Sequence, residues 1–196
     1  MYLTVNYGNS GGTYAHRAKA GEEVEFTTTL TEMDDTAILI YAASHIQALN
    51  DLSACYIHDN DFSKAVKLQT LVIGNDTPGY ENIFLTNLNI FPPNPTGTAK
   101  EMLLSTLDIR NCPNLSGALN VSNCPNLRIL NASNTSIASV NFPVGGKLTT
   151  VFLPDTLTSL TVNNLKYLET FNVAGYDHLI RFYCNDTNFI NPLAIV

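Results

Sequence analysis

The feature that most constrains this chain is a short motif that returns with fixed spacing. Cys112-Pro-Asn-Leu115 recurs as Cys124-Pro-Asn-Leu127, and an asparagine precedes both copies. The first copy follows Leu104, Leu107 and Ile109, which are spaced L-x-x-L-x-I. Residues two apart on a strand point to the same side, so Leu107 and Ile109 are predicted to enter a core and the residue between them to face outward.

The same spacing recurs along much of the chain and matches the leucine-rich-repeat template L-x-x-L-x-L-x-x-N/C. Further copies are Leu127/Leu130/Ala132, Leu157/Leu160/Val162, Leu168/Phe171/Val173 and Leu179/Phe182/Cys184, with weaker copies at Leu68/Leu71/Ile73 and Leu85/Leu88/Ile90. The last three of the strong copies begin eleven residues apart. A leucine-rich coil needs about 20–29 residues, so two such units are expected to make one coil of about 21 residues.

Two half-coils per coil predict two sets of stacked strands. Strands near 107, 130, 151 and 171 would stack as one sheet, and strands near 119, 140, 160 and 182 as the opposite one. The alternative is a tight β-helix with one eleven-residue unit per turn. That alternative makes Cys112 and Cys124 neighbours, whereas the two-unit coil puts them on opposite sides.

The residues before the repeat predict a small β cap over 1–45, followed by the solenoid over 46–196. Strands are expected at Tyr2–Val5, Glu22–Phe26 and Ala37–Tyr41, with a glycine-rich turn at 8–12 between the first two. Asp61 is expected to cap one helical turn over 61–67. The predicted fold is therefore mainly β, a leucine-rich-repeat-like solenoid with an N-terminal β cap.

The composition indicates a surface rich in neutral polar residues. Charged residues make up 14% of the chain, against about 25% in an ordinary soluble domain, and Asn, Thr and Ser take their place. This composition is common in secreted adhesive proteins and virion proteins. The net charge of −7 argues against nucleic acid or an anionic membrane as a partner.

Neither end of the sequence carries a recognisable targeting or capping signal. The longest apolar run, Ala37–Ala43, is far shorter than the roughly 20 residues of a membrane span. The first residues do not resemble a signal peptide. The last nine, 188–196, show no polar cap, so the last coil is expected to be open and the chain to belong to a longer chain or assembly.

The sequence predicts no catalytic residue, metal site or cofactor, and hence no enzyme. The four histidines are scattered. Asp59-Asn-Asp61 lacks the glycine and distal glutamate of a calcium loop, and Asp34-Asp35 are adjacent on a turn rather than facing across a cleft. Cys112 and Cys124 are interpreted as buried thiols that pack turns rather than as a disulfide.

The outward strand positions are the candidate ligand-binding residues. On one face they are Asp108, Asn131, Phe152 and Asn172, and on the other Asn120, Asn141, Thr161 and Tyr183. Solenoids present such rows as binding surfaces, and amides beside aromatic rings suit carbohydrate. The bland interpretation, which the low charge favours, is that Asn keeps a sheet soluble. The Asn-x-Ser tripeptides at 120–122 and 131–133 are attributed to an Asn- and Ser-rich composition.

Several stretches resemble a recurrent module in proteins from phages and prophages of gut bacteria. They are Ile46–Ser53, Asp61–Gly74, Leu107–Val121, Leu153–Leu160 and Val173–Leu179. More distantly, the leucine units are similar to leucine-rich-repeat surface adhesins of bacteria. The resemblance implies a location in a virion or at a cell surface. It implies other virion or surface proteins as partners, with a host glycan as a further candidate, and it supplies no catalytic residues.

The resulting expectation is a non-enzymatic structural or receptor-contacting module of a phage tail or fibre protein. The alternatives are an adhesin module of a bacterial surface and a carbohydrate-binding accessory part of a larger enzyme. Capsid and portal genes beside this gene would favour the first, a wall-anchor signal the second, and an active-site domain elsewhere in the full-length chain the third.

Overall fold

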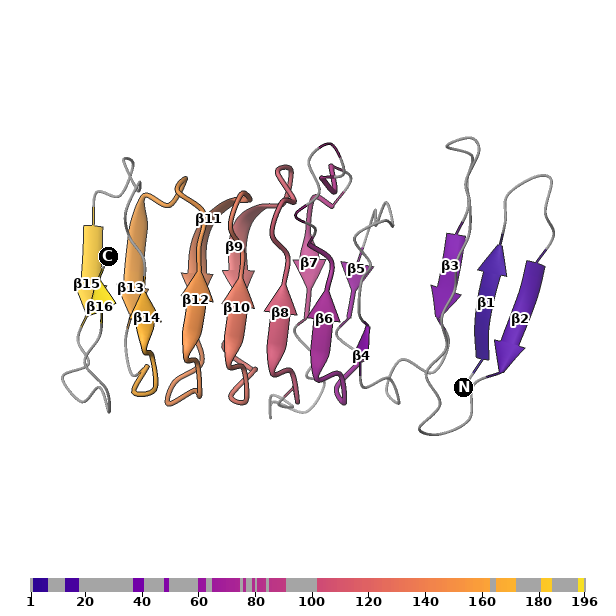
Figure 1. Cartoon of the computed structure of the whole chain (residues 1–196), viewed down its shortest axis with the longest axis horizontal. Coiled ribbons are helices and arrows are strands. Elements are labelled where there is room, and N and C mark those ends of the chain that lie inside the picture. Colours follow the sequence, from indigo (N-terminus) through magenta and orange to yellow (C-terminus); the bar gives the residue numbers. More distant parts are fainter. Residues whose placement is uncertain are drawn as a thin grey trace, which may run out of the picture. The chain divides into compact units, whose positions relative to one another are not determined.

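A computed structural model gives the structure of the chain, which divides into two compact units, Met1–His45 and Ile46–Val196 (Figure 1). The residues that it describes are 2–6, 13–17, 37–40, 48–49, 60–62, 65–74, 76, 79, 81–83, 85–90, 102–162, 165–171, 181–184 and 194–195. Within these ranges the regular structure consists of β-strands and contains no helix, so the predicted mainly-β class is confirmed. Accordingly, no described segment is a helix that could cross a bilayer.

The first unit contains a three-stranded antiparallel sheet. Strand β1 (Tyr2–Asn6) lies between β2 (Thr13–Arg17) and β3 (Ala37–Ile40), with Val5 opposite both Tyr14 and Ile38. The sequence predicted strands at β1 and β3 but missed β2. The other predicted strand of this unit, Glu22–Phe26, lies outside the described residues.

The second unit is built around a seven-stranded parallel sheet, called the large sheet below. Its strands in spatial order are β4 (Ala48–Leu49), β6 (Thr70–Val72), β8 (Thr106–Asp108), β10 (Ile129–Asn131), β12 (Thr150–Phe152), β14 (Thr170–Phe171) and β16 (Ala194–Ile195). The register places Leu107 beside Leu130, Leu130 beside Val151, and Val151 beside Phe171. The first predicted series of stacked strands is thereby confirmed.

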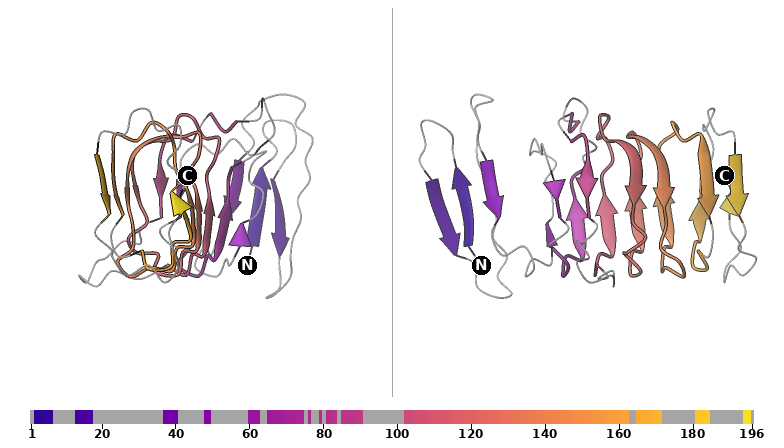
Figure 2. Two further views of the ribbon diagram at one scale, coloured as in Figure 1. Left: turned by 60° about the vertical axis from the view of Figure 1, so that its left-hand side comes forward. Right: turned by 180° about the vertical axis from the view of Figure 1, so that it is seen from behind.

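The remaining strands of this unit form three parallel pairs. The pairs are β5 (Asn60–Asp61) with β7 (Leu88–Asn89), β9 (Ser116–Asn120) with β11 (Ser136–Asn141), and β13 (Ser159–Val162) with β15 (Arg181–Cys184). In Figure 1, β9 and β11 lie behind the large sheet, and the reverse view in Figure 2 brings that side forward. Strand β8 pairs with β10 and not with β9, which rules out one eleven-residue unit per turn.

The second predicted sheet, with strands near 119, 140, 160 and 182, forms the expected neighbouring pairs but not one continuous sheet. Leu119 lies beside Val140, and Leu160 lies beside Phe182, as expected. The two pairs nevertheless belong to separate sheets. The Thr156 hydroxyl donates to the carbonyl of Ile137 at 3.3 Å, so a side chain from the loop before β13 occupies an acceptor of β11.

The core of the second unit consists of the aliphatic positions that the repeat marks. Leu107, Leu130 and Val151 are buried in the middle of their strands, while both neighbours of each are more exposed. Leu104 and Leu127, which begin their units, are fully buried as well. The alternation expected from the spacing is therefore confirmed.

The predicted helical turn at 61–67 is wrong. Asp61 ends strand β5, where it pairs with Asn89, and the described residues that follow it do not form a helix. Two successive turns follow, in which Ala65 N donates to Phe62 O at 2.9 Å and Leu68 N to Ala65 O at 2.8 Å. These turns bring Leu68 into the core.

Candidate binding surfaces

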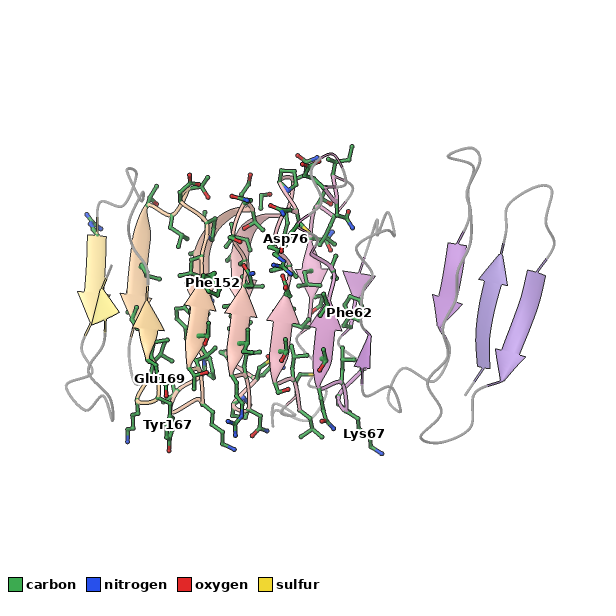
Figure 3. All side chains as sticks on the ribbon, viewed as in Figure 1. Phe62, Lys67, Asp76, Phe152, Tyr167 and Glu169 are labelled. Atoms are coloured by element: carbon green, nitrogen blue, oxygen red, sulfur yellow. The ribbon has the colours of Figure 1, made fainter. Side chains whose placement is uncertain are left out.

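The outward row predicted on the large sheet is present for the residues that the structure describes. Asp108, Asn131 and Phe152 are neighbours in register on β8, β10 and β12. Figure 3 shows Phe152 at the upper end of β12. Its side chain is 44% exposed, which is unusual for an aromatic residue within a sheet. Asn172, the fourth member of the predicted row, lies outside the described residues.

Three of the candidate ligand-binding side chains close turns at the ends of their own strands. Asn131 Oδ1 accepts hydrogen bonds from Ser133 N at 3.2 Å and Ser133 Oγ at 2.8 Å. Asn120 Oδ1 accepts the same two bonds from Ser122, at 3.1 and 2.8 Å. Asp108 Oδ1 accepts from the nitrogen of Arg110 at 3.2 Å. These are Asx turns.

The Asx turns correct the attribution of the Asn-x-Ser tripeptides to composition alone. Within each tripeptide, the serine supplies both a backbone and a hydroxyl donor to the asparagine two residues earlier. The signal was visible in the sequence, because each tripeptide begins at the outward position that follows a buried strand residue. The Oδ1 atoms of Asn120 and Asn131 are therefore already engaged, and a ligand would have to use their amide nitrogens.

The opposite predicted row is divided between the two strand pairs described above. Asn120 lies beside Asn141, and Thr161 lies beside Tyr183. Asn141 and Thr161 are exposed. The Tyr183 side chain lies outside the description, although its backbone belongs to β15. These four residues therefore form two short rows, in place of the single row that was expected.

A second outward row on the large sheet was missed from the sequence. Thr70, Thr106, Ile129 and Thr150 are aligned at the first residue of their strands. Ile129 is 41% exposed and lies one strand away from Phe152 on a diagonal. This row could have been found from the sequence, because each of its members directly precedes the central buried residue of its strand. We call the group Thr106, Ile129, Asn131, Thr150 and Phe152 the sheet face.

An ion-pair cluster joins the ends of β6 and β8. Arg110 Nη1 contacts Asp76 Oδ2, and Arg110 Nη2 lies 3.2 Å from Asp108 Oδ2. Burial raises the pKa of Asp108 above its usual range, and this effect outweighs the opposing influence of the Arg110 nitrogen and guanidinium. Arg110 Nε is buried and has no hydrogen-bond partner. These ion pairs hold the connection after β8 against the connection after β6.

A ladder of asparagines stacks at the same end of the unit. Asn111 and Asn134 both have a φ of 54°, the left-handed region that asparagine tolerates better than most residues. Asn134 Nδ2 donates to Asn111 Oδ1 at 2.7 Å, and Asn111 N donates to Ser133 O at 3.0 Å. The positions are equivalent in successive repeats, so the ladder holds adjacent turns in alignment.

The two cysteines of the motif are buried free thiols, which confirms the prediction made for them. Cys112 lies in the connection from β8 to β9, and Cys124 in that from β9 to β10. Burial raises the pKa of each to about 12, with a further contribution from Asp108 at Cys112. Groups of this kind pack a turn and are poor nucleophiles.

Among the described residues there is no cluster of His, Cys, Asp and Glu able to hold a metal ion. The sequence candidates Asp34, Asp35 and Asp59 lie outside that part of the chain. Comparison with protein-family models, curated proteins and solved structures found no match to this chain.

Proposed function

We propose that residues 46–196 form a leucine-rich-repeat-like solenoid that binds a partner and carries out no chemistry. The spacing of the paired strands supports this architecture, because Leu107, Leu130, Val151 and Phe171 follow one another at 23, 21 and 20 residues. These steps fit the length of a leucine-rich coil. The asparagine ladder and the buried leucine row supply the contacts that stack one coil on the next.

The binding surface in this proposal is the sheet face, and the exposed pair Ile129 and Phe152 carries the argument. An aromatic ring and an aliphatic side chain lie exposed next to one another, with the hydroxyls of Thr106 and Thr150 beside them. Ring faces stack on sugars, and hydroxyls and amides bond to them. The partner that fits best is a carbohydrate receptor on a cell surface.

We further propose that the module belongs to a phage tail or fibre protein and is located in the virion or at a cell surface. This assignment rests on the resemblance in Ile46–Ser53 and the other stretches given above. In that setting the solenoid is a rigid spacer whose outward rows contact the host or a neighbouring virion protein.

The test is retention of the chain on host-cell glycans by Phe152→Ala and Tyr183→Ala variants. Loss of the ring at 152 is expected to weaken binding by about tenfold, since a stacked ring contributes about 1 kcal/mol or more. Val144→Ala is the matched control, because Val144 is 83% exposed but lies in the turn after β11, away from the sheet face. Unchanged binding by Phe152→Ala, with the parent retained, refutes the proposed surface. Tyr183→Ala probes the separate short row on β13 and β15.

A further inference from the structure

Four of the six basic residues that the structure describes in the second unit gather on one edge of the large sheet. We call it the entry edge, because it consists of the connections that lead into β6, β8, β10, β12 and β14. Its described segments are 65–69, 102–105, 125–128, 146–149 and 165–169. The charged residues of these segments are Lys67, Arg128, Lys147, Lys166 and Glu169. Figure 3 places Lys67 and Tyr167 at this edge, toward opposite ends of the row.

Backbone hydrogen bonds align these connections with one another. The bonds are Leu103 N to Val66 O at 3.1 Å, Arg128 N to Ser105 O at 2.8 Å, Lys147 N to Pro125 O at 3.3 Å and Glu169 N to Thr149 O at 3.1 Å. Adjacent connections are therefore separated by the strand spacing of about 4.8 Å. The four cations are all exposed. They are spread over four strand steps, or about 19 Å, with Arg128 nearer to the start of its strand than the three lysines.

The charge on this edge is opposite to that of the chain as a whole. The net charge is −7, yet one glutamate accompanies four cations in the segments of the entry edge. The connections that leave β6 and β12 carry Asp76 and Asp155. Arg110, in the connection that leaves β8, is paired with acids. Cations one or two strand steps apart lie within a Debye length of about 10 Å, so they act on a ligand together.

The side chains between the cations suit a ligand that is polar as well as charged. Gln69 and Asn126 supply amides, and Lys147 Nζ already donates to Asn126 Oδ1 at 2.9 Å. The hydroxyls of Ser105 and Thr149 donate to the carbonyls of Gln69 and Arg128, which leaves their oxygens as acceptors for a ligand. Tyr167 is 44% exposed and adds an aromatic ring at one end. Duplex DNA carries about one charge per 1.7 Å, much denser than this row.

We propose that the entry edge binds a linear acidic polysaccharide, a polymer whose carboxylates or sulfates are separated by neutral sugar hydroxyls. The polymer lies along the row from Lys67 to Lys166, across the strands. Each cation pairs with an acidic group, and the intervening amides and hydroxyls bond to the sugar. This surface is distinct from the sheet face and does not depend on it.

The first measurement compares the whole chain with three probes at low salt by calorimetry: polygalacturonate, dextran sulfate and neutral dextran. Polygalacturonate or dextran sulfate is expected to bind at least about tenfold more tightly than dextran, and the affinity is expected to fall as salt rises. Tighter binding of polygalacturonate would identify carboxylates as the recognised groups, and tighter binding of dextran sulfate would identify sulfates. Equal binding of all three probes overturns the proposal.

The second measurement neutralises the row. The combined Lys67→Gln, Arg128→Gln, Lys147→Gln and Lys166→Gln variant is expected to bind the acidic polymer about tenfold more weakly or worse and to lose most of the salt dependence. Arg181→Gln is the matched control, since Arg181 is an exposed cation on β15, outside the large sheet. Circular dichroism verifies the fold, and the single variants Arg128→Gln and Lys147→Gln give a graded loss if the combined variant does not fold.

Three further results overturn this assignment. An equal effect of Arg181→Gln means that the charges act without a defined surface. Tighter binding of a DNA duplex than of either acidic polymer means that the row recognises charge density. Unchanged binding by the combined variant excludes the entry edge. Phe152→Ala is expected to leave this binding intact, which separates failure here from failure of the sheet face.

Discussion

At the scale of single residues, Gly74 shows how closely adjacent turns approach one another. A Cβ at this position would lie 2.6 Å from Arg110 N and 2.7 Å from Arg110 O, both backbone atoms that cannot move aside cheaply. Arg110 is itself held by Asp76 and Asp108. Gly74→Ala is therefore expected to lower the free energy of unfolding by about 1–3 kcal/mol.

Urea denaturation of the parent and the Gly74→Ala variant measures this difference. Gly117→Asn is the control, because a Cβ at Gly117 meets open space and its φ of 82° lies in the region that asparagine accepts. The control is expected to change stability by less than about 1 kcal/mol. Equal effects of the two substitutions would contradict the contact with Arg110 as the cause of the loss at Gly74.

The buried thiols give a second prediction at this scale. With a pKa of about 12, Cys112 and Cys124 are almost entirely protonated at pH 8, so a thiolate-dependent alkylating reagent is expected to spare them in the native protein. Both are expected to react fully in denaturant. Peptide mapping by mass spectrometry after iodoacetamide treatment reports each cysteine separately, and native labelling at the rate of an exposed thiol would contradict their burial.

The residue scale also shows where sequence patterns stop being informative. The inward leucines and the buried cysteines follow from spacing, because burial repeats with the period of the strand. The ion-pair role of Asp108 does not follow from spacing. Its partner Arg110 also pairs with Asp76, which lies 34 residues before Arg110 in the chain. A contact across that separation depends on which turns stack, and no local pattern contains it.

At the scale of elements, the Asx turns determine where the strands of the large sheet end. Asn131→Ala removes the acceptor of two hydrogen bonds from Ser133 and is expected to lower the free energy of unfolding by about 1–2 kcal/mol. Asn131→Asp keeps the acceptor and is expected to change it by less, as Asp108 fills the equivalent position naturally. Thermal unfolding of the two variants tests this, and an equal loss would show that the turn does not depend on Oδ1.

Element boundaries were predictable where the repeat is strong and, outside it, at β1 and β3. The strands around Leu107, Leu130 and Val151 appear where the spacing places them. Strand β2 was missed, because antiparallel pairing with β1 sets it rather than a repeat. Asp61 was expected to cap a helical turn, but Ala65 and Leu68 bond to carbonyls three residues earlier in two successive turns.

At the scale of the whole molecule, stability depends on rows of side chains that run through several strands. Leu130 is fully buried between Leu107 and Val151 in the central part of the large sheet. Leu130→Ala is expected to lower the free energy of unfolding by about 2–5 kcal/mol, through lost burial and the cavity left between its neighbours. Leu103→Ala is the control on the exposed entry edge, with an expected effect below about 1 kcal/mol.

Denaturant titration followed by circular dichroism measures both variants. A loss at Leu130 no larger than that at Leu103 would contradict the buried row. At this scale the sequence predicted the pairing order, since steps of 20 to 23 residues between equivalent leucines set it. It did not predict the segregation of charge, because Lys67, Arg128 and Lys147 are far apart in the chain and meet only after the turns are stacked.

The hydroxyls that link the connections before neighbouring strands show that the large sheet tolerates connections of unequal length. Ser105 Oγ donates to the carbonyl of Gln69, 36 residues earlier, while Thr149 Oγ1 makes the equivalent bond to Arg128, only 21 residues earlier. The alignment of β6 with β8 is nevertheless the same as that of β10 with β12. Insertions between two strands can therefore lengthen a connection and add new loops without changing how the strands of the large sheet pair.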